Sequence, residues 1–146
     1  MKRLTIVSVL FSQVLLFSCS SGPEPILFGQ DACHHCKMTI MDNHFGAEII
    51  TAKGKVFKFD AAECMANFLH ENGAELKKSG NTFLTVDYAS PGVFVDATKA
   101  SFLKDKAVRS PMGGNLSSFN SLQAAKDNRK SADGIVLSWE ELLNNY

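Results

Sequence analysis

The chain of 146 residues lacks the residue patterns on which most enzymes and nucleic-acid-binding proteins depend. No pairing of a nucleophile with a base, no arrangement of paired carboxylates and no phosphate-binding glycine loop is recognisable in it. Its 15 basic residues are balanced by 15 acidic ones, so it has no electrostatic surface for nucleic acid. These absences predict a non-enzymatic protein that does not bind nucleic acid.

The chain also lacks an apolar run long enough to cross a membrane. Lys2 and Arg3 precede a mostly apolar stretch over residues 4–16, which is interrupted by polar side chains and too short to span a bilayer. This pattern predicts a cleaved signal peptide over residues 1–18. The peptide ends in Leu-Phe-Ser-Cys, which resembles a bacterial lipobox with Cys19 as the lipidated residue. An ordinary secreted protein is the alternative.

Residues 19–30 begin with a polar stretch containing Pro and Gly, which predicts a short lipidated tether. Two or more acyl chains hold a protein stably on a bilayer, so the mature domain would be anchored to a membrane through Cys19. No Asp follows Cys19, and by resemblance to lipoprotein sorting patterns this predicts the outer membrane of a Gram-negative-type bacterium, facing the periplasm. Loss of Lys2 and Arg3 leaves 13 basic against 15 acidic residues.

Cysteine is scarce, and three cysteines remain besides Cys19, namely Cys33, Cys36 and Cys64. An odd number of thiols in an oxidising compartment argues against a framework of structural disulfides. Either one thiol is buried and inert, or the thiols are kept for a metal.

The most informative motif is Cys-His-His-Cys-Lys-Met over residues 33–38. Thiolates and thioethers are soft donors, which favour Cu(I). Cys33, Cys36 and Met38 supply enough soft ligands for that ion, and a disulfide exchanger has no chemical use for the methionine. The Cys-x-x-Cys spacing alone is shared by dithiol redox motifs, zinc sites and local disulfides, so these alternatives stay open.

The sequence around the motif disfavours two of the alternatives. A redox dithiol needs its first thiol at a helix N-terminus, and residues 38–46 contain a turn-like Asp-Asn rather than a long amphipathic helix. A structural zinc site needs four ligands, and no second closely spaced ligand pair is present. A Cys33–Cys36 disulfide would abolish copper binding, because the metal requires reduced thiols.

Other sulfur and imidazole side chains are further candidates. Met112 lies in a Pro-Met-Gly-Gly loop, which presents sulfur better than it fills a core. His34 and His35 lie between the cysteines and could bind or tune a metal. Cys64 and Met65 share the apolar face of an expected helix, where packing is the simpler explanation and a ligand role the alternative.

The hydrophobic pattern predicts an α+β fold of two small ββαβ units, the first over residues 31–90. Strands over 46–51 and 55–59 flank a short Gly-containing connection, which is typical of a β-hairpin. A helix is expected to begin at Asp60 and to end at Asn72-Gly73, and a strand over 82–86 follows it.

The second unit, over residues 91–146, can be read in the same order. Its helix is expected to be capped by Ser117 or Ser118 and to end near Asn128. The other expected elements are strands over 93–95, 107–109 and 135–137 and a short terminal helix over 138–143.

Several segments match, in order, the pattern of a known family. They are Cys-x-x-Cys-x-Met over 33–38, Phe-Gly-Ala-Glu-Ile-Ile over 45–50, residues 59–65, residues 86–88 and the loop over 111–114 that leads to Ser-Phe at 118–119. The ordered set resembles NosL, the copper-binding accessory lipoprotein family of nitrous-oxide reductase maturation. Two departures are mild: Lys37 stands where Gly is common, and Phe94 where Trp is often found.

The resemblance implies two ββαβ units, a lipid anchor and delivery of Cu(I). Cys33, Cys36 and Met38 match the family's metal motif, and Met112 matches its second methionine motif. The implied client is apo nitrous-oxide reductase, whose copper–sulfide centre would receive the metal, although another cuproenzyme remains open. The expected function is therefore that of a copper chaperone, with a thiol-disulfide oxidoreductase or a zinc-stabilised envelope module as the alternatives.

Overall fold

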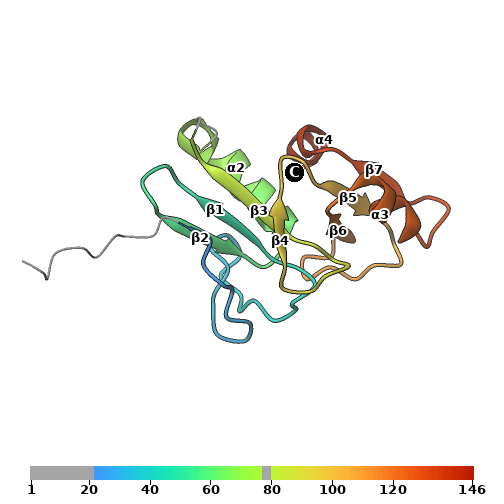
Figure 1. Cartoon of the computed structure of the whole chain (residues 1–146), viewed down its shortest axis with the longest axis horizontal. Coiled ribbons are helices and arrows are strands. Elements are labelled where there is room, and N and C mark those ends of the chain that lie inside the picture. Colours follow the sequence, from blue (N-terminus) through green and yellow to red (C-terminus); the bar gives the residue numbers. More distant parts are fainter. Residues whose placement is uncertain (1–21, 77–79) are drawn as a thin grey trace, which may run out of the picture.

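The computed structural model describes residues 22–76 and 80–146, which form two antiparallel sheets with helices packed against them (Figure 1). The predicted signal peptide over residues 1–18 and the predicted lipidation site Cys19 lie outside the described residues. Among the helices that the structure describes, none combines the length and the apolar character needed to cross a bilayer.

The first sheet confirms the strands predicted for the first half. It contains β1 (Ala47–Ile50), β2 (Val56–Phe59), β3 (Thr82–Val86) and β4 (Phe94–Asp96) in the order β2-β1-β3-β4. All neighbours are antiparallel, and the β1–β2 pair is the predicted hairpin. Helix α2 (Ala62–Leu76) follows β2 and packs against β1 and β2.

The predicted end of this helix at Asn72-Gly73 was wrong. Helix α2 continues through both residues to Leu76. The Asn72 side chain donates a hydrogen bond to the carbonyl of Phe68, one turn earlier, and so supports the helix. A glycine inside a helix costs only about 1 kcal/mol, and packing of Leu76 against the core offsets this cost.

The second sheet repeats the topology of the first. It contains β5 (Ser101–Lys104), β6 (Leu116–Phe119) and β7 (Ile135–Leu137) in the order β6-β5-β7, which corresponds to β2-β1-β3. Helix α3 (Leu122–Asp127) lies between β6 and β7 in the chain, and α4 (Trp139–Asn145) ends it. Both halves thus contain a ββαβ sequence of elements, and the predicted α+β class is confirmed.

Two strand predictions in the second half need correction. The strand expected over 93–95 forms as β4, but it pairs with β3 and belongs to the first sheet. No strand forms over 107–109, because Asp105 closes a turn there: its side chain accepts the N–H of Ala107 and its carbonyl accepts the N–H of Val108. The strand that pairs with β6 is β5 instead.

The helix expected to begin at Ser117 or Ser118 was also wrong. Both serines lie in β6, whose four residues are all buried. The hydroxyl of Ser118 forms a buried hydrogen bond of 2.8 Å with that of Thr85, so it is satisfied within the fold rather than at a helix end. Ser121 caps α3 instead, whereas the predicted Ser138 cap of the terminal helix is confirmed.

The two sheets share one hydrophobic core. Helices α2 and α4 pack against each other, which joins the halves (Figure 1). The largest buried cluster combines Phe59 and Leu69 from the first half with Phe102, Trp139 and Leu142 from the second. This shared core fixes α2, and therefore Cys64, relative to the loops of the second half.

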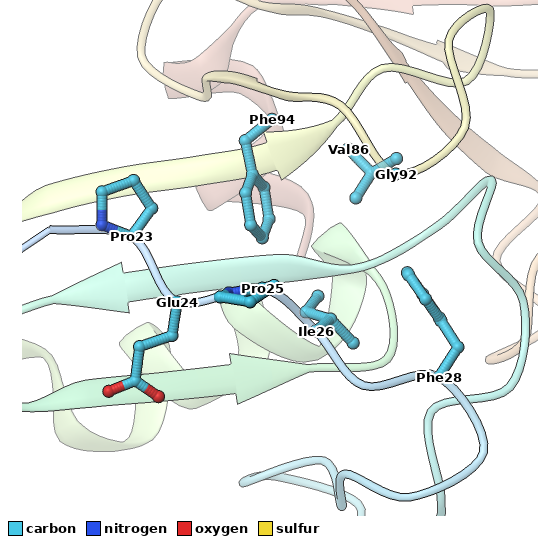
Figure 2. A pocket seen from close by; sticks show the side chains of 8 residues that line it. All are labelled: Pro23, Glu24, Pro25, Ile26, Phe28, Val86, Gly92 and Phe94. Carbon is cyan, nitrogen blue, oxygen red and sulfur yellow. The ribbon is translucent and has the colours of Figure 1, made fainter.

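Residues 23–28, the first part of the segment that precedes β1, lie on the face of the first sheet opposite α2. The ammonium of Lys58 on β2 donates to the carbonyl of Pro25 at 3.0 Å and to the carboxylate of Asp31 at 2.8 Å. Together with β3 and β4 this segment borders an apolar hollow of about 310 Å³. Ile26 and Phe94 are among the side chains that line it (Figure 2). Both faces of β1 are therefore covered.

A carboxyl group is buried under this segment. Glu48 on β1 is fully buried, its Oε2 accepts the N–H of Glu24 at 3.3 Å, and its Oε1 has no hydrogen-bond partner within the described structure. Burial raises the pKa of Glu48 from its ordinary value of 4.5 to about 7, although the charge of Lys58 lowers it. The folded state therefore favours the protonated form of this side chain.

We expect Glu48→Gln to stabilise the protein at pH 8 by about 1–3 kcal/mol. Because the folded pKa lies above the unfolded one, the contribution of Glu48 is full below pH 4.5 and is lost as the pH rises through 7. The gain from the neutral amide should therefore grow over this interval. Urea unfolding at pH 4.5 and pH 8 measures it.

The matched control is Asp133→Asn, which neutralises a carboxylate that is 81% exposed. Its effect should stay within about 0.5 kcal/mol at both pH values. An equal response of the two variants to pH would contradict the assignment to buried Glu48.

Candidate metal centre

The Cys-x-x-Cys motif forms a closed turn that lies beside β2. The N–H of Cys33 donates to the carbonyl of Met38 at 2.8 Å, and the N–H of Lys37 donates to the carbonyl of Cys33 at 3.1 Å. The N–H of His34 bonds to the carbonyl of Lys58, which ties the turn to β2. No helix follows the motif, as the sequence predicted.

Lys37 adopts the left-handed backbone conformation, with φ of 66°. This conformation favours glycine, which explains physically why glycine suits this position of the motif. The Lys37 ammonium folds back and donates to the carbonyl of His34 at 2.5 Å. The turn between the two cysteines is thereby closed by its own residues.

The three cysteines converge. The sulfur atoms of Cys33, Cys36 and Cys64 all lie within 4.8 Å of one another, and all three thiols are free. Cys64 comes from the first turn of α2, on the face that packs against the sheet. Cys33 and Cys64 are buried while Cys36 is partly exposed, so the cluster is open to solvent on the Cys36 side.

The three thiols differ in pKa, which is lowered for Cys33 and raised for Cys36 and Cys64. The hydrogen bond with the Cys64 thiol is the main cause that lowers the pKa of Cys33, and backbone groups of Asp60, Cys36 and His35 add to it. The same bond raises the pKa of Cys64. Burial raises the pKa of Cys36, as does the neighbouring Cys33. Asp60 lies just before α2, so the sulfur of Cys33 lies near the start of that helix.

The methionines divide into exposed and buried ones. Met38 is 49% exposed and Met112 is 37% exposed, whereas Met65 is fully buried in the core. Met38 lines an open hollow of about 360 Å³ together with Pro111, the residue before Met112. The structure thus brings the first methionine motif and the second methionine loop to the edges of one hollow, and it places Met65 in a packing position.

The two histidines of the motif point to separate neighbours. The His34 ring packs edge-on against Phe57, with 4.9 Å between the ring centroids. Nδ1 of His35 lies 3.5 Å from a carboxylate oxygen of Glu71 on α2. Neither histidine belongs to the group of side chains whose ligand atoms lie together in the part of the chain that the structure describes.

Two carboxyl groups near the cluster were missed by the sequence reasoning. Asp60 is buried and lines the same hollow as Met38. Burial, then the nearby Cys33, raises the pKa of Asp60 to about 6, and a hydrogen bond from the N–H of Met41 opposes this shift. Glu63 is also buried and accepts a hydrogen bond from Ser110. Their only sequence signal was the helix start predicted at Asp60.

The donor set indicates which metals suit the cluster. Three soft sulfur atoms, with no imidazole or carboxylate among them, match the preference of Cu(I). A structural zinc site needs a fourth ligand. The cluster is also chemically able to exchange disulfides, since a thiolate near a helix start is nucleophilic, so geometry alone leaves the oxidoreductase alternative open.

Comparisons with known proteins agree with the resemblance seen in the sequence. The sequence model of the NosL family matches residues 26–146. Among solved structures, the crystal structure of the copper chaperone NosL from Shewanella denitrificans superimposes with a TM-score of 0.67 at 20% sequence identity, covering 83% of this chain and 95% of that one. No curated protein sequence matches the chain. Because the family model covers most of the chain, the protein belongs to the NosL family.

Proposed function

We propose that this protein is a copper chaperone that binds Cu(I) through Cys33, Cys36 and Met38, with Met112 as a further sulfur ligand. The observation that carries the proposal is the convergence of three free thiols, two of them in the motif that also contains the exposed Met38. Cys64 completes a three-thiol cluster, so we include it among the ligands. His34, His35 and Met65 remain weaker candidates, since each has another packing or polar partner.

The geometry suits a carrier rather than a catalyst. Thiolates hold Cu(I) tightly, and the ion needs only two or three sulfur donors at a time. The five candidate sulfur atoms would therefore bind it in turn rather than all at once, which leaves room for an incoming ligand from a client. Cys36 is the partly exposed member of the cluster, and Met38, two residues after it, borders an open hollow together with Pro111 of the Met112 loop. A client ligand would therefore approach from this side, and copper would pass by exchange of sulfur ligands.

We further propose that the mature protein is a lipoprotein anchored through Cys19 to the outer membrane and facing the periplasm. Its client would be apo nitrous-oxide reductase, which needs copper to assemble its copper–sulfide centre. Family membership and the copper chaperone identity of the Shewanella protein support a role in copper delivery. Another cuproenzyme is the alternative client.

The function is tested by anaerobic copper titration and transfer. Purified reduced protein should bind one equivalent of Cu(I) against a competing chelator and should keep its fold when the metal is removed. Copper-loaded protein mixed with apo nitrous-oxide reductase should then lose copper to the enzyme, measured by metal analysis after the two proteins are separated.

Two controls separate the alternatives. The same protein oxidised to a Cys33–Cys36 disulfide should neither bind nor deliver copper. A zinc-stabilised module would instead contain zinc after purification and unfold on chelation, and an oxidoreductase would turn over a disulfide substrate without metal. Either of these results, together with weak Cu(I) binding, would exclude the chaperone.

A further inference from the structure

A buried carboxyl group links the helix that bears Cys64 to the loop that bears Met112. Glu63 precedes Cys64 on α2 and is 1% exposed. Its Oε1 accepts a buried hydrogen bond of 2.6 Å from the hydroxyl of Ser110, which lies two residues before Met112. Its Oε2 has no hydrogen-bond partner within the described residues. One end of the methionine loop is thus fastened directly to α2.

The other end of the loop lies against the same carboxyl group. A Cβ added to Gly114 would stand 2.8 Å from Oε1 of Glu63 and 2.8 Å from the hydroxyl of Tyr146, which is closer than real Cβ atoms approach other atoms. Any larger residue here would push the ends of these two side chains aside, whereas glycine leaves them in place. Gly113, with φ of 71°, supplies the turn that reverses the chain after Met112. The backbone conformation at Gly113 and the close contacts at Gly114 therefore explain why glycine occupies both positions.

Tyr146 closes the arrangement from the second half of the molecule. Its ring packs against the main core, and the ammonium of Lys104 lies 5.4 Å from the ring centroid. Its hydroxyl is buried without a hydrogen-bond partner in the part of the chain that the structure describes. Three segments that are distant in the chain thus meet at the methionine loop. They are α2 with Glu63, the loop itself with Ser110 and Gly114, and the end of α4 with Tyr146.

From this geometry we infer that Glu63 is a positioning residue, which holds Met112 at a fixed distance from the cysteine cluster. The inference rests on the proposed function, since it assumes that Met112 is a sulfur ligand. Met112 lies between the two points at which the loop meets Glu63, and Glu63 adjoins Cys64 on a helix that the core holds in place. A loop held at both sides loses little freedom when its sulfur binds metal.

The test is a cycle of variants, with anaerobic Cu(I) affinity as the first measurement. Glu63→Ala and Ser110→Ala each remove one partner of the hydrogen bond and should weaken Cu(I) binding by about 10–100-fold, as is typical for residues that orient ligands. In a Met112→Leu background, neither substitution should weaken binding further. Glu63→Gln keeps an oxygen that accepts the Ser110 hydrogen bond and should restore near wild-type affinity.

X-ray absorption at the copper edge provides a readout that a general loss of stability would not move. Glu63→Ala should remove one sulfur neighbour from copper, as Met112→Leu does, while the remaining sulfur neighbours stay. Ser110→Ala, a milder change, gives the same information if Glu63→Ala does not fold.

Three outcomes would overturn the inference. Equal weakening by Ser110→Ala in the wild-type and Met112→Leu backgrounds would mean that the group acts through Cys64 instead. Unchanged affinity in both backgrounds, or in Met112→Leu itself, would remove any role for a fixed loop. These outcomes differ from failure of the proposed function, in which the wild-type protein itself would bind no Cu(I).

Discussion

The double variant Cys33→Ser/Cys36→Ser is expected to lose Cu(I) to a competing chelator under conditions in which the wild-type protein retains it. A serine hydroxyl is a hard donor that stays protonated, so it does not replace a thiolate for Cu(I). Changes in residues that merely orient ligands cost about 10–100-fold in affinity, so we expect removal of two ligands to cost more than about 100-fold. Anaerobic titration against a chromogenic chelator measures the change.

Two further variants make the result specific. Cys64→Ser should weaken binding less than the double change, because Cys33 and Cys36 would still bind copper as a pair. Met65→Leu removes a sulfur atom from the adjacent position of α2 but conserves volume in the core, so it should cost less than about 1.5 kcal/mol in stability and leave affinity unchanged.

Affinity unaffected by the double change would disprove the site assignment, provided that the variant is folded. Circular dichroism and thermal unfolding check this condition. Loss of binding in Met65→Leu at unchanged stability would instead move a ligand role to Met65.

The fold was predictable from sequence where the chain carries local signals. The hairpin of β1 and β2 has two apolar runs around a Gly-containing connection, and α4 has the Ser138 cap with Glu141 three residues later. β6 lacks such a signal because its two serines are buried among apolar neighbours. The Ser118 hydroxyl is satisfied by Thr85 of the first sheet, and that of Ser117 by the carbonyl of Leu103 on the paired strand β5. No local pattern reveals these partners.

The candidate site likewise combines residues with a local sequence signal and residues that only the folded structure brings together. Cys33, Cys36 and Met38 lie so close in the chain that their spacing alone suggested soft-metal chemistry. The position of Cys64 depends on how α2 packs, since the helix face that suggested a packing role is also the face that meets the motif. The role of Glu63 depends on a contact between residues that are far apart in the chain, because its partner Ser110 belongs to the second half.

The second large effect is expected for Leu142→Ala, which should lower the free energy of unfolding by about 2–5 kcal/mol. Leu142 lies on α4, is fully buried, and belongs to the core cluster shared by both halves. The substitution leaves a cavity where α4 meets α2, and the packed surroundings can close it only in part. Because the core is shared, the loss should destabilise both sheets together rather than the second half alone.

Trp139 is the single tryptophan and reports on this shared core directly. Its ring lies 5.4 Å from that of Phe83 on β3 and 6.3 Å from that of Phe102 on β5, so it contacts both sheets. Urea unfolding followed by tryptophan fluorescence and by far-UV circular dichroism should give one coincident midpoint, shifted equally in the variant. Leu122→Ala on α3 is the matched control, since Leu122 is 51% exposed, and it should change stability by less than about 0.5 kcal/mol.

Separate midpoints for the two probes in Leu142→Ala would show that the halves unfold independently. In that case the first half would keep its sheet and its cysteine cluster after the second half had unfolded, and the loop carrying Met112 would be released from α2. Copper affinity measured between the two midpoints would then fall to that of Met112→Leu. A single midpoint means instead that Met112 and the cysteines are held together or lost together, because one core positions both.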